Sequence, residues 1–177
     1  FLDIVNEDAK GEWMARHKRV FVSTDLSAAS DTLPRDLLDA FRQGVLDARP
    51  QAAWVERTLE LLTGPQRLVY PDETEVTSQR GALMGLPTTW FFLSLAQLFW
   101  IDRAVKVSPR RLGVGAHRRA VVCGDDLLAY WPKAISVAYH RVAEECGAEF
   151  SPGKHFVSHD AMCFTEEIAF ASFRKVP

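Results

Sequence analysis

The sequence has few cysteines and no motif in which they would pair or bind zinc. Its 177 residues include Cys123, Cys146 and Cys163, which lie far apart and form no Cys-x-x-Cys motif. This odd, scattered set argues against a disulfide framework or a structural zinc site, and it favours a reducing compartment. Ten glycines and nine prolines follow no period, and there is no internal repeat. Collagen-like and low-complexity classes are therefore excluded.

A strong charge of either sign is also lacking. The net charge is −2 and the isoelectric point is near 6.2, whereas nucleic-acid binders usually carry a basic excess. Basic residues do cluster at 16–19 and at 110–119, where a solvated loop and a phosphate contact are equally good interpretations. Eleven phenylalanines and five tryptophans supply a core, so the composition fits one globular domain and excludes disorder.

No hydrophobic run is convincing as a membrane span. Residues 81–101 carry no charge and are numerous enough, but they include Gly81, Gly85 and Pro87, and only 90–101 is strongly apolar. We expect a buried helix after a Gly/Pro loop, and no membrane span. No signal or transit peptide is visible, and because residue 1 is Phe we expect the sequence to begin inside a longer polypeptide.

Apolar periodicity and turn residues predict an α+β fold with an antiparallel sheet and helices on one face. We expect strands at 19–24, 120–123 and 127–131, with shorter ones within 149–158 and 162–173. Helices are expected from Pro34 onward and at 52–62, 88–106 and 132–145, and a hairpin at 66–79. Residues 26–32 have the small, polar composition of a loop, with Asp31 or Thr32 as the cap of the helix after it.

The most informative motif is the acidic turn Cys123-Gly124-Asp125-Asp126 between two apolar strands. Adjacent carboxylates repel each other and are poorly solvated beside apolar strands, so a divalent cation is their natural counter-charge. Hard oxygen ligands favour Mg²⁺ or Mn²⁺ over zinc. The alternative is an ordinary solvent-exposed type I′ or II′ turn, which the motif taken alone favours.

A second acidic site changes this balance. Asp25 ends the first predicted strand, and if that strand lies beside the acidic hairpin, Asp25 and Asp125 meet at one end of the sheet. Two metal ions about 3.5–4 Å apart could then be bridged, as phosphoryl or nucleotidyl transfer requires. Asp31 follows in the next loop and could reach a hydroxyl close to the metals. Its alternative role is the helix cap already mentioned.

Two further segments carry possible substrate contacts. The loop that contains Gly85 leads into Thr88 and Thr89 at a helix start, where backbone and hydroxyl groups can approach a ribose or phosphate. The alternative is a plain helix entrance capped by Thr88. Lys154 lies on the turn Ser151-Pro152-Gly153-Lys154 and could steady a triphosphate or protonate pyrophosphate; alternatively it is a surface lysine.

In this order the four segments resemble the palm domain of viral RNA-dependent RNA polymerases. Asp25-Leu-Ser-Ala-Ala-Ser-Asp31, Gly81-Ala-Leu-Met-Gly-Leu-Pro-Thr-Thr-Trp90 and Cys123-Gly-Asp-Asp126 are similar to the narnavirus, ourmia-like virus and mitovirus polymerases, and more distantly to RNA-phage replicases. Residues 164–170 are similar to the primer-grip hairpin of these families. The resemblance extends from about Val20 to Phe170.

The resemblance implies a role for each matched residue. Asp25 and Asp125 would hold two Mg²⁺ (or Mn²⁺) ions, with Asp126 as an auxiliary ligand. Asp31 would recognise the 2′-hydroxyl of the incoming nucleotide, and Lys154 would be the general acid for pyrophosphate. Gly85, Thr88 and Thr89 would contact template and ribose. Leu93 stands where many of these polymerases have an asparagine.

The resemblance also implies an architecture and an activity. Residues 1–177 would form a single palm domain with a three-stranded core sheet, part of the fingers at about 48–80 and a primer-grip-like hairpin at about 160–174. Most of the fingers and the thumb would be missing, so we expect the isolated chain to be inactive. The expected activity is template-directed addition of ribonucleotides to an RNA 3′-hydroxyl during viral genome replication.

The expected partners are an RNA template, a primer or nascent strand, nucleoside triphosphates and the missing fingers and thumb segments. Two alternatives remain open: a reverse-transcriptase palm, and a catalytically inactive fragment of a membrane-associated replication complex. The host cytoplasm is the expected location, and the mitochondrion is the alternative.

Overall fold

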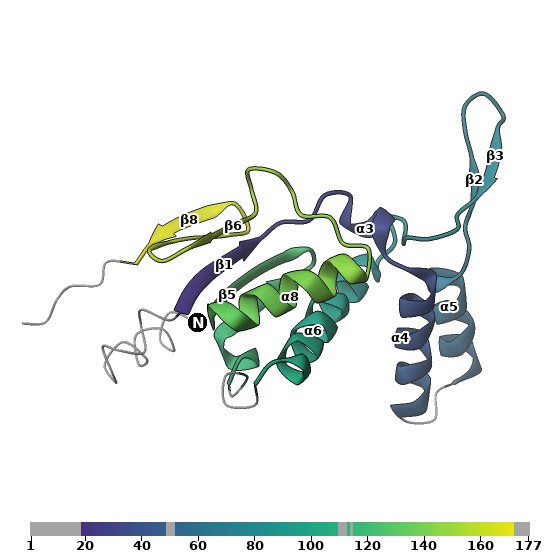
Figure 1. Cartoon of the computed structure of the whole chain (residues 1–177). Helices are drawn as coiled ribbons and strands as arrows, with labels where there is room; N and C mark the ends of the chain where they lie inside the picture. Colours follow the sequence, from purple (N-terminus) through teal and green to yellow (C-terminus); the bar gives the residue numbers. More distant parts are fainter. Residues whose placement is uncertain (1–18, 49–51, 110–112, 114, 172–177) are drawn as a thin grey trace, which may run out of the picture.

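A four-stranded antiparallel sheet forms the centre of the molecule in the computed structural model, which describes residues 19–48, 52–109, 113 and 115–171 (Figure 1). The strands lie in the order β4 (Ala120–Cys123), β5 (Asp126–Pro132), β1 (Arg19–Thr24) and β6 (Phe156–Ser158). The α+β class and the antiparallel sheet are confirmed. The prediction of three strands was wrong, because β6 pairs with the second edge of β1 and satisfies its backbone groups.

Strand β1 is central because both of its faces are covered. Its residues from Val20 to Thr24 are all buried. Val20 and Val22 belong to the main core, whereas Phe21 packs on the opposite face against a smaller cluster that includes Tyr130 and Met162. Figure 1 shows α6 and α8 on one face of the sheet and the β7–β8 hairpin beside the other. A β-branched and aromatic strand suits this doubly covered position.

Two helices supply the largest share of the main core. Helix α6 (Thr89–Val107) and helix α8 (Lys133–Glu145) pack against each other and against the sheet. Trp131 at the end of β5 is fully buried, and its indole N–H donates to the carbonyl of Ala116 at 2.9 Å. Both helices start and end within about one residue of the predicted bounds. Among the helices of the described ranges, none combines the length and apolar character needed to cross a membrane.

The segment after β1 differs from the prediction. Residues 29–32 form one helical turn, α3 (Ala29–Thr32), instead of a loop. The Thr32 hydroxyl donates to the carbonyl of Ala29 within this turn, and the Asp31 carboxylate accepts from the Ser30 hydroxyl, at 3.2 and 3.3 Å. The predicted cap of the next helix by Asp31 or Thr32 was therefore wrong. The turn packs against α6, and its small residues Ala29, Ser30 and Thr32 are buried.

Residues 35–78 extend away from the sheet. Helices α4 (Arg35–Ala48) and α5 (Ala53–Thr63) pack together, and β2 (Arg67–Val69) and β3 (Glu75–Thr77) form a hairpin that projects beyond them (Figure 1). The Arg35 guanidinium donates to the Thr63 carbonyl and to Ser78, which ties the hairpin base to α4. The two helices and the hairpin agree with the expected elements. Their assignment to the fingers stays a prediction.

The chain ends in a second hairpin, formed by β7 (Ala161–Phe164) and β8 (Glu167–Phe170). Thr165 and Glu166 at its turn both have positive φ, 50° and 66°. The hairpin coincides with the expected primer-grip segment as far as Phe170, and residues 172–174 of that segment lie outside the described residues. Ile168 and Phe170 are largely exposed, and the primer-grip role remains a prediction.

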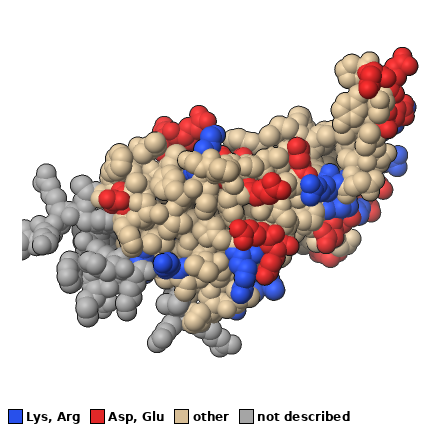
Figure 2. All heavy atoms as spheres, turned by 45° about the horizontal axis from the view of Figure 1, so that its top comes forward, with Lys and Arg blue, Asp and Glu red and all other residues tan. Residues whose placement is uncertain are grey.

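The charges on the surface are mixed. On the face shown in Figure 2, small groups of acidic and basic side chains lie among neutral residues, and acidic side chains gather at the tip of the β2–β3 hairpin. Of the two basic clusters at 16–19 and 110–119, residues 16–18 and 110–111 lie outside the described residues. The described part of the chain therefore adds no broad basic surface on this face.

A histidine pair supports the segment between α8 and β6. The rings of His140 and His155 lie 4.7 Å apart between centroids, and both contact Phe150. Burial lowers the pKa of both imidazoles, and the neighbouring His140 adds to the effect on His155, whose pKa falls to about 4. Both rings are therefore neutral in the folded chain at neutral pH.

This pair predicts that the folded chain loses stability in mild acid. The unfolded chain binds a proton at His155 near pH 6.5, whereas the folded chain does so only near pH 4. The stabilising contribution is complete above about pH 6.5 and is lost as the pH falls towards about 4. We expect His155→Phe to reduce the fall in the free energy of unfolding between about pH 7 and about pH 5.

Urea denaturation at the two pH values measures this change. His159→Phe, on the exposed turn before β7, is the matched control and should keep the wild-type fall. An equal fall in His155→Phe and in the wild-type chain would contradict the assignment.

Candidate active site

Strand pairing brings the predicted acids to one end of the sheet. In the antiparallel pair of β1 and β5, Thr24 lies opposite Leu127. The same register continued by one residue sets Asp25 opposite Asp126, and Asp125 precedes Asp126 in the β4–β5 turn. All three are partly buried. The structure therefore joins acids that are distant along the chain, as the sequence predicted.

The acidic turn is a two-residue hairpin loop. Cys123 pairs with Asp126, and between them Gly124 has a φ of 63°. A glycine with positive φ at the first central position is the pattern of a type II′ turn. Gly124 is buried, and a Cβ there would lie 3.5 Å from the ring of Trp90 on α6. The turn has the ordinary geometry considered above, but it is packed against a helix instead of standing free in solvent.

The pKa of Asp126 responds to several charged groups around it. The pKa of Asp126 is raised, first by burial and then by the negative charges of Asp125 and Asp25, while Lys154 opposes the shift. Glu166 at the β7–β8 turn raises it further. Sequence reasoning missed Glu166, although its acidic pair with Glu167 in the hairpin was a signal. The site thus has an excess of negative charge, which suits a cation.

The acids do not form a ready-made cluster of ligands. Within the described residues, no group of three or more His, Cys, Asp or Glu side chains is close enough together to hold a metal ion. The negative charges of Asp25 and Asp125 are near enough to raise the pKa of Asp126, and the oxygen chemistry of the three carboxylates fits Mg²⁺ or Mn²⁺. Their role as metal ligands is therefore taken up as a proposal.

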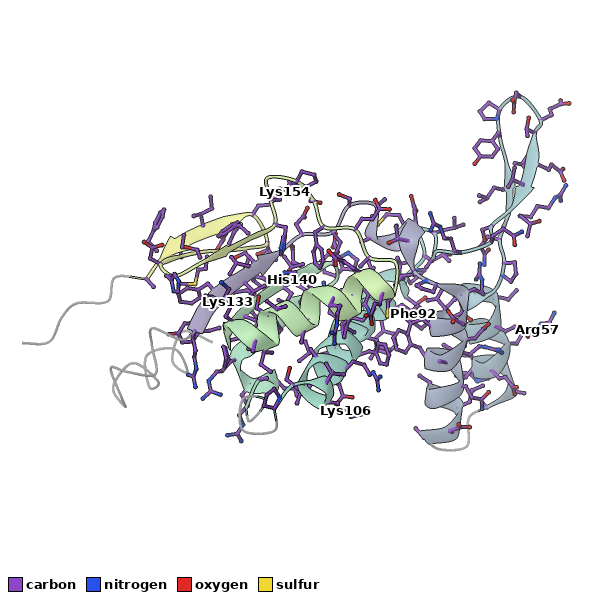
Figure 3. The ribbon with its side chains drawn as sticks, in the orientation of Figure 1. Arg57, Phe92, Lys106, Lys133, His140 and Lys154 are labelled. Carbon is purple, nitrogen blue, oxygen red and sulfur yellow. The ribbon has the colours of Figure 1, made fainter. Side chains whose placement is uncertain are left out.

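Lys154 is joined to the site through its loop. Figure 3 places Lys154 on the segment that leads from α8 to β6. The backbone of this segment is bonded to the end of β1: the Ser151 N–H donates to the Asp25 carbonyl at 2.9 Å, and the Ser27 N–H donates to the Glu149 carbonyl at 2.8 Å. Together with the effect of Lys154 on Asp126, these bonds place the lysine on the acidic side of the sheet.

The loop before α6 is fastened to α3. The Gly81 and Ala82 N–H groups donate to the carbonyls of Leu33 and Ser30, both at 2.8 Å. Gly81 has a φ of 82°, and a Cβ there would lie 2.9 Å from the Ser30 and Asp31 carbonyl oxygens, so packing requires glycine. These bonds set the exposed Asp31 beside the loop.

Gly85 differs from Gly81 in what its surroundings require. It is exposed, its φ is ordinary, and a Cβ there would meet no atom within 4 Å. Neither the fold nor the backbone conformation therefore demands glycine at this position. The space beside its backbone is open to a ligand.

The two threonines at the helix start behave differently. The buried Thr89 hydroxyl donates to the Leu83 carbonyl at 2.7 Å and so closes the loop onto α6. Thr88 occupies the capping position, but its side chain makes no capping hydrogen bond, so that alternative was wrong. Leu93, one turn further on, is 2% exposed and lies in the core. Its apolar side chain cannot make the hydrogen bonds of the asparagine that many of the resembling polymerases have at this position.

Sequence reasoning also missed two partners of the acidic turn. Ser94 and Gln97 on α6 bond to the backbone of Gly124 and Asp125. Both are polar residues within the apolar run at 90–101, which was the available signal.

Comparisons with known proteins agree with this geometry. No protein-family model matches the sequence. The chain is 41% identical over 157 residues to the RNA-directed RNA polymerase of Saccharomyces 23S RNA narnavirus, and 40% identical over 160 residues to that of Saccharomyces 20S RNA narnavirus. The alignments cover 83% and 87% of this chain but only 16% and 19% of those polymerases. The chain thus spans less than a fifth of these relatives.

Solved structures show the same fold. The crystal structure of the RNA-dependent RNA polymerase of a human picobirnavirus matches 97% of this chain with a TM-score of 0.73, and 32% of that polymerase is covered. Its insertion-loop deletion mutant matches with a TM-score of 0.71. Sequence identity is 14% in both cases, so this likeness establishes the fold alone. Together with the narnavirus relatives it confirms the resemblance found in the motifs: over most of its length the chain is similar to a segment of the narnavirus RNA-directed RNA polymerases.

Proposed function

We propose that this chain is the catalytic core of an RNA-directed RNA polymerase. The observation that supports the proposal is the pairing of Thr24 with Leu127, because Asp25 follows the first and Asp126 precedes the second at the same end of the sheet, with Asp125 in the adjoining turn. The narnavirus relatives that share the sequence support the choice of reaction. Because the chain spans so little of these relatives, the complete activity would also need fingers and thumb segments.

Asp25, Asp125 and Asp126 would hold two Mg²⁺ or Mn²⁺ ions. The raised pKa of Asp126 supports this assignment, because it reflects burial together with negative charges that the chain only partly compensates. When bound, such ions activate the attacking hydroxyl and neutralise the charge on the departing pyrophosphate. Binding of the metal ions would offset the repulsion between the carboxylates.

The remaining residues would bind and orient the reactants. The 3′-oxygen of the growing RNA forms a bond to the α-phosphorus of a nucleoside triphosphate, and the bond from that phosphorus to pyrophosphate breaks. The positive charge of Lys154 lies near enough to act on Asp126. Lys154 would attract the triphosphate and give a proton to the leaving pyrophosphate. Asp31 would accept a hydrogen bond from the 2′-hydroxyl.

The loop before α6 would receive the template and the ribose. Gly85 leaves open space beside its backbone, and Thr88 and Thr89 begin the helix that contacts the acidic turn. Close approach of a sugar or phosphate to this backbone needs the absence of a side chain at Gly85.

The acidic turn predicts the outcome of removing one charge. In a complete polymerase that carries this chain, Asp125→Asn should lower ribonucleotide incorporation at least about a thousandfold, because it removes a proposed ligand without changing volume. RNA binding should change less than about twofold, because a negatively charged turn does not attract the phosphates that dominate RNA affinity. A primer-extension assay and an RNA-binding titration measure the two effects.

Asp102→Asn is the matched control for this experiment. Asp102 lies on α6 in an exposed ion pair with Lys106, and its loss should leave incorporation intact. Normal incorporation by Asp125→Asn would contradict the proposed function, and a preference for deoxyribonucleotides would favour the reverse-transcriptase alternative.

The two glycines of the loop predict opposite effects of an added methyl group. Gly85→Ala should change the free energy of unfolding by less than about 0.5 kcal/mol, yet raise the KM for nucleotide at least about fivefold. Gly81→Ala should destabilise the fold by about 2 kcal/mol or more, because of its positive φ and the carbonyl contacts. Urea denaturation and steady-state kinetics separate the effects; an unchanged KM in Gly85→Ala would remove this loop from the substrate site.

A further inference from the structure

Two side chains of one helix hold the backbone of the acidic turn. The central residues of a two-residue hairpin have backbone groups outside the strand ladder, and these groups need other partners. The Ser94 hydroxyl accepts the Gly124 N–H at 3.0 Å, and the Gln97 amide donates to the Asp125 carbonyl at 2.7 Å. Ser94 and Gln97 are three residues apart on α6 and therefore lie on the same side of it.

Gln97 is an unusual residue for its surroundings. It is 0% exposed, and its neighbours on the buried side of α6 are apolar, among them Leu93, Trp100 and Ile101. An amide in such a place is unfavourable unless both of its ends are paired. Its nitrogen is paired with the turn, and its oxygen accepts a hydrogen bond from the Tyr139 hydroxyl on α8.

Tyr139 determines which way the Gln97 amide points. A hydroxyl donor meets the amide oxygen, so the amide nitrogen faces the Asp125 carbonyl; the reverse orientation would set two oxygens against each other. Burial raises the pKa of Tyr139, and the hydroxyl therefore keeps its hydrogen at neutral pH. Both polar ends of the Gln97 amide are therefore paired in the observed arrangement, from Tyr139 on α8 through α6 to the turn.

This arrangement opposes a force at the site. The carboxylate of Asp126 lies near the negative charges of Asp125 and Asp25, and like charges repel, so a force acts on the two-residue turn between β4 and β5. The turn also packs on Trp90, but that contact gives no direction to the backbone. A hydrogen bond to the Asp125 carbonyl restrains the residue that carries the carboxylate.

We propose that Gln97 is a positioning residue that holds the acidic turn through the Asp125 carbonyl, with Tyr139 orienting its amide. The kinetic consequence rests on the proposed polymerase function, whereas the restraint on the turn is a property of the chain itself. Displacement of a reacting group by about 1 Å costs on the order of a hundredfold in rate, so the restraint matters for catalysis.

The test replaces the amide by an apolar side chain of similar length. Gln97→Met removes the donor to the turn and keeps most of the packing volume. Ile101→Val, also fully buried and one turn further along α6, is the matched control for loss of core packing. Hydrogen exchange of the Gly124 amide in the 177-residue chain reports the turn, measured against the Val22 amide, which reports global opening.

In Gln97→Met, the Gly124 amide should exchange at least about tenfold faster relative to Val22, and Ile101→Val should leave this ratio unchanged. In a complete polymerase that carries the chain, Gln97→Met should lower kcat by about 10- to 100-fold and change the KM for nucleotide less than about threefold. Tyr139→Phe should give a smaller loss, and the double variant should be no worse than Gln97→Met.

Two outcomes of the exchange experiment would overturn the positioning role: an unchanged exchange ratio in Gln97→Met, or the same acceleration in Ile101→Val. A polymerase in which Gln97→Met keeps the wild-type kcat, while Asp125→Asn is inactive, would also overturn it and leave the proposed function standing. If the exchange ratio responds as expected but the wild-type polymerase incorporates no nucleotide, the proposed function fails and the restraint on the turn is supported.

Discussion

Antiparallel pairing between β1 and β5 is the constraint on which the rest of the molecule depends. Because Thr24 lies opposite Leu127, the residues that follow and precede them, Asp25 and Asp126, must meet at the same end of the sheet. A shift of one residue would move Phe21 from the smaller core cluster to the main one and reverse every other side chain of β1. Packing on both faces therefore sets the register, and the register sets the site.

The gathered acids lower the stability of the fold through electrostatic repulsion, which the packing of the core must offset. Three carboxylates gather at the sheet end, and Asp126 responds with a raised pKa. The surrounding backbone is held by contacts: the β4–β5 turn packs on Trp90, and the loop before Lys154 is bonded to the Asp25 backbone. Helix α6 links these supports, because its first residue closes the glycine loop and its middle contacts the turn. One helix thus connects the proposed nucleotide loop to the acids.

Much of this could be predicted from local patterns. The β-branched residues of 19–24, the apolar strands around Gly124 and the glycine-bounded helices identify their elements, because each pattern reflects a local preference. The meeting of Asp25 with the acidic turn also followed, since it needs only that two strand ends lie side by side. The order of the motifs indicated the resemblance to viral RNA polymerases, which the narnavirus relatives then confirmed.

What the sequence could not predict depends on tertiary placement. Strand β6 is only three residues long, and its pairing with β1 comes from the position of the segment after α8. The helical turn α3 forms because its small residues are buried. Glu166 and Gln97 act on the site only because a hairpin and a helix are packed beside it, and no spacing in the chain reveals that contact.

The central claim is that acids from two distant strands act on the same ions. Titration of the 177-residue chain with Mn²⁺, followed by electron paramagnetic resonance, tests it directly with Asp25→Asn, Asp125→Asn and the double variant. The account predicts that each single variant weakens the same Mn²⁺ binding at least about tenfold and that the double variant loses less than the two effects combined. Unchanged binding in Asp25→Asn, with binding lost in Asp125→Asn, would contradict it.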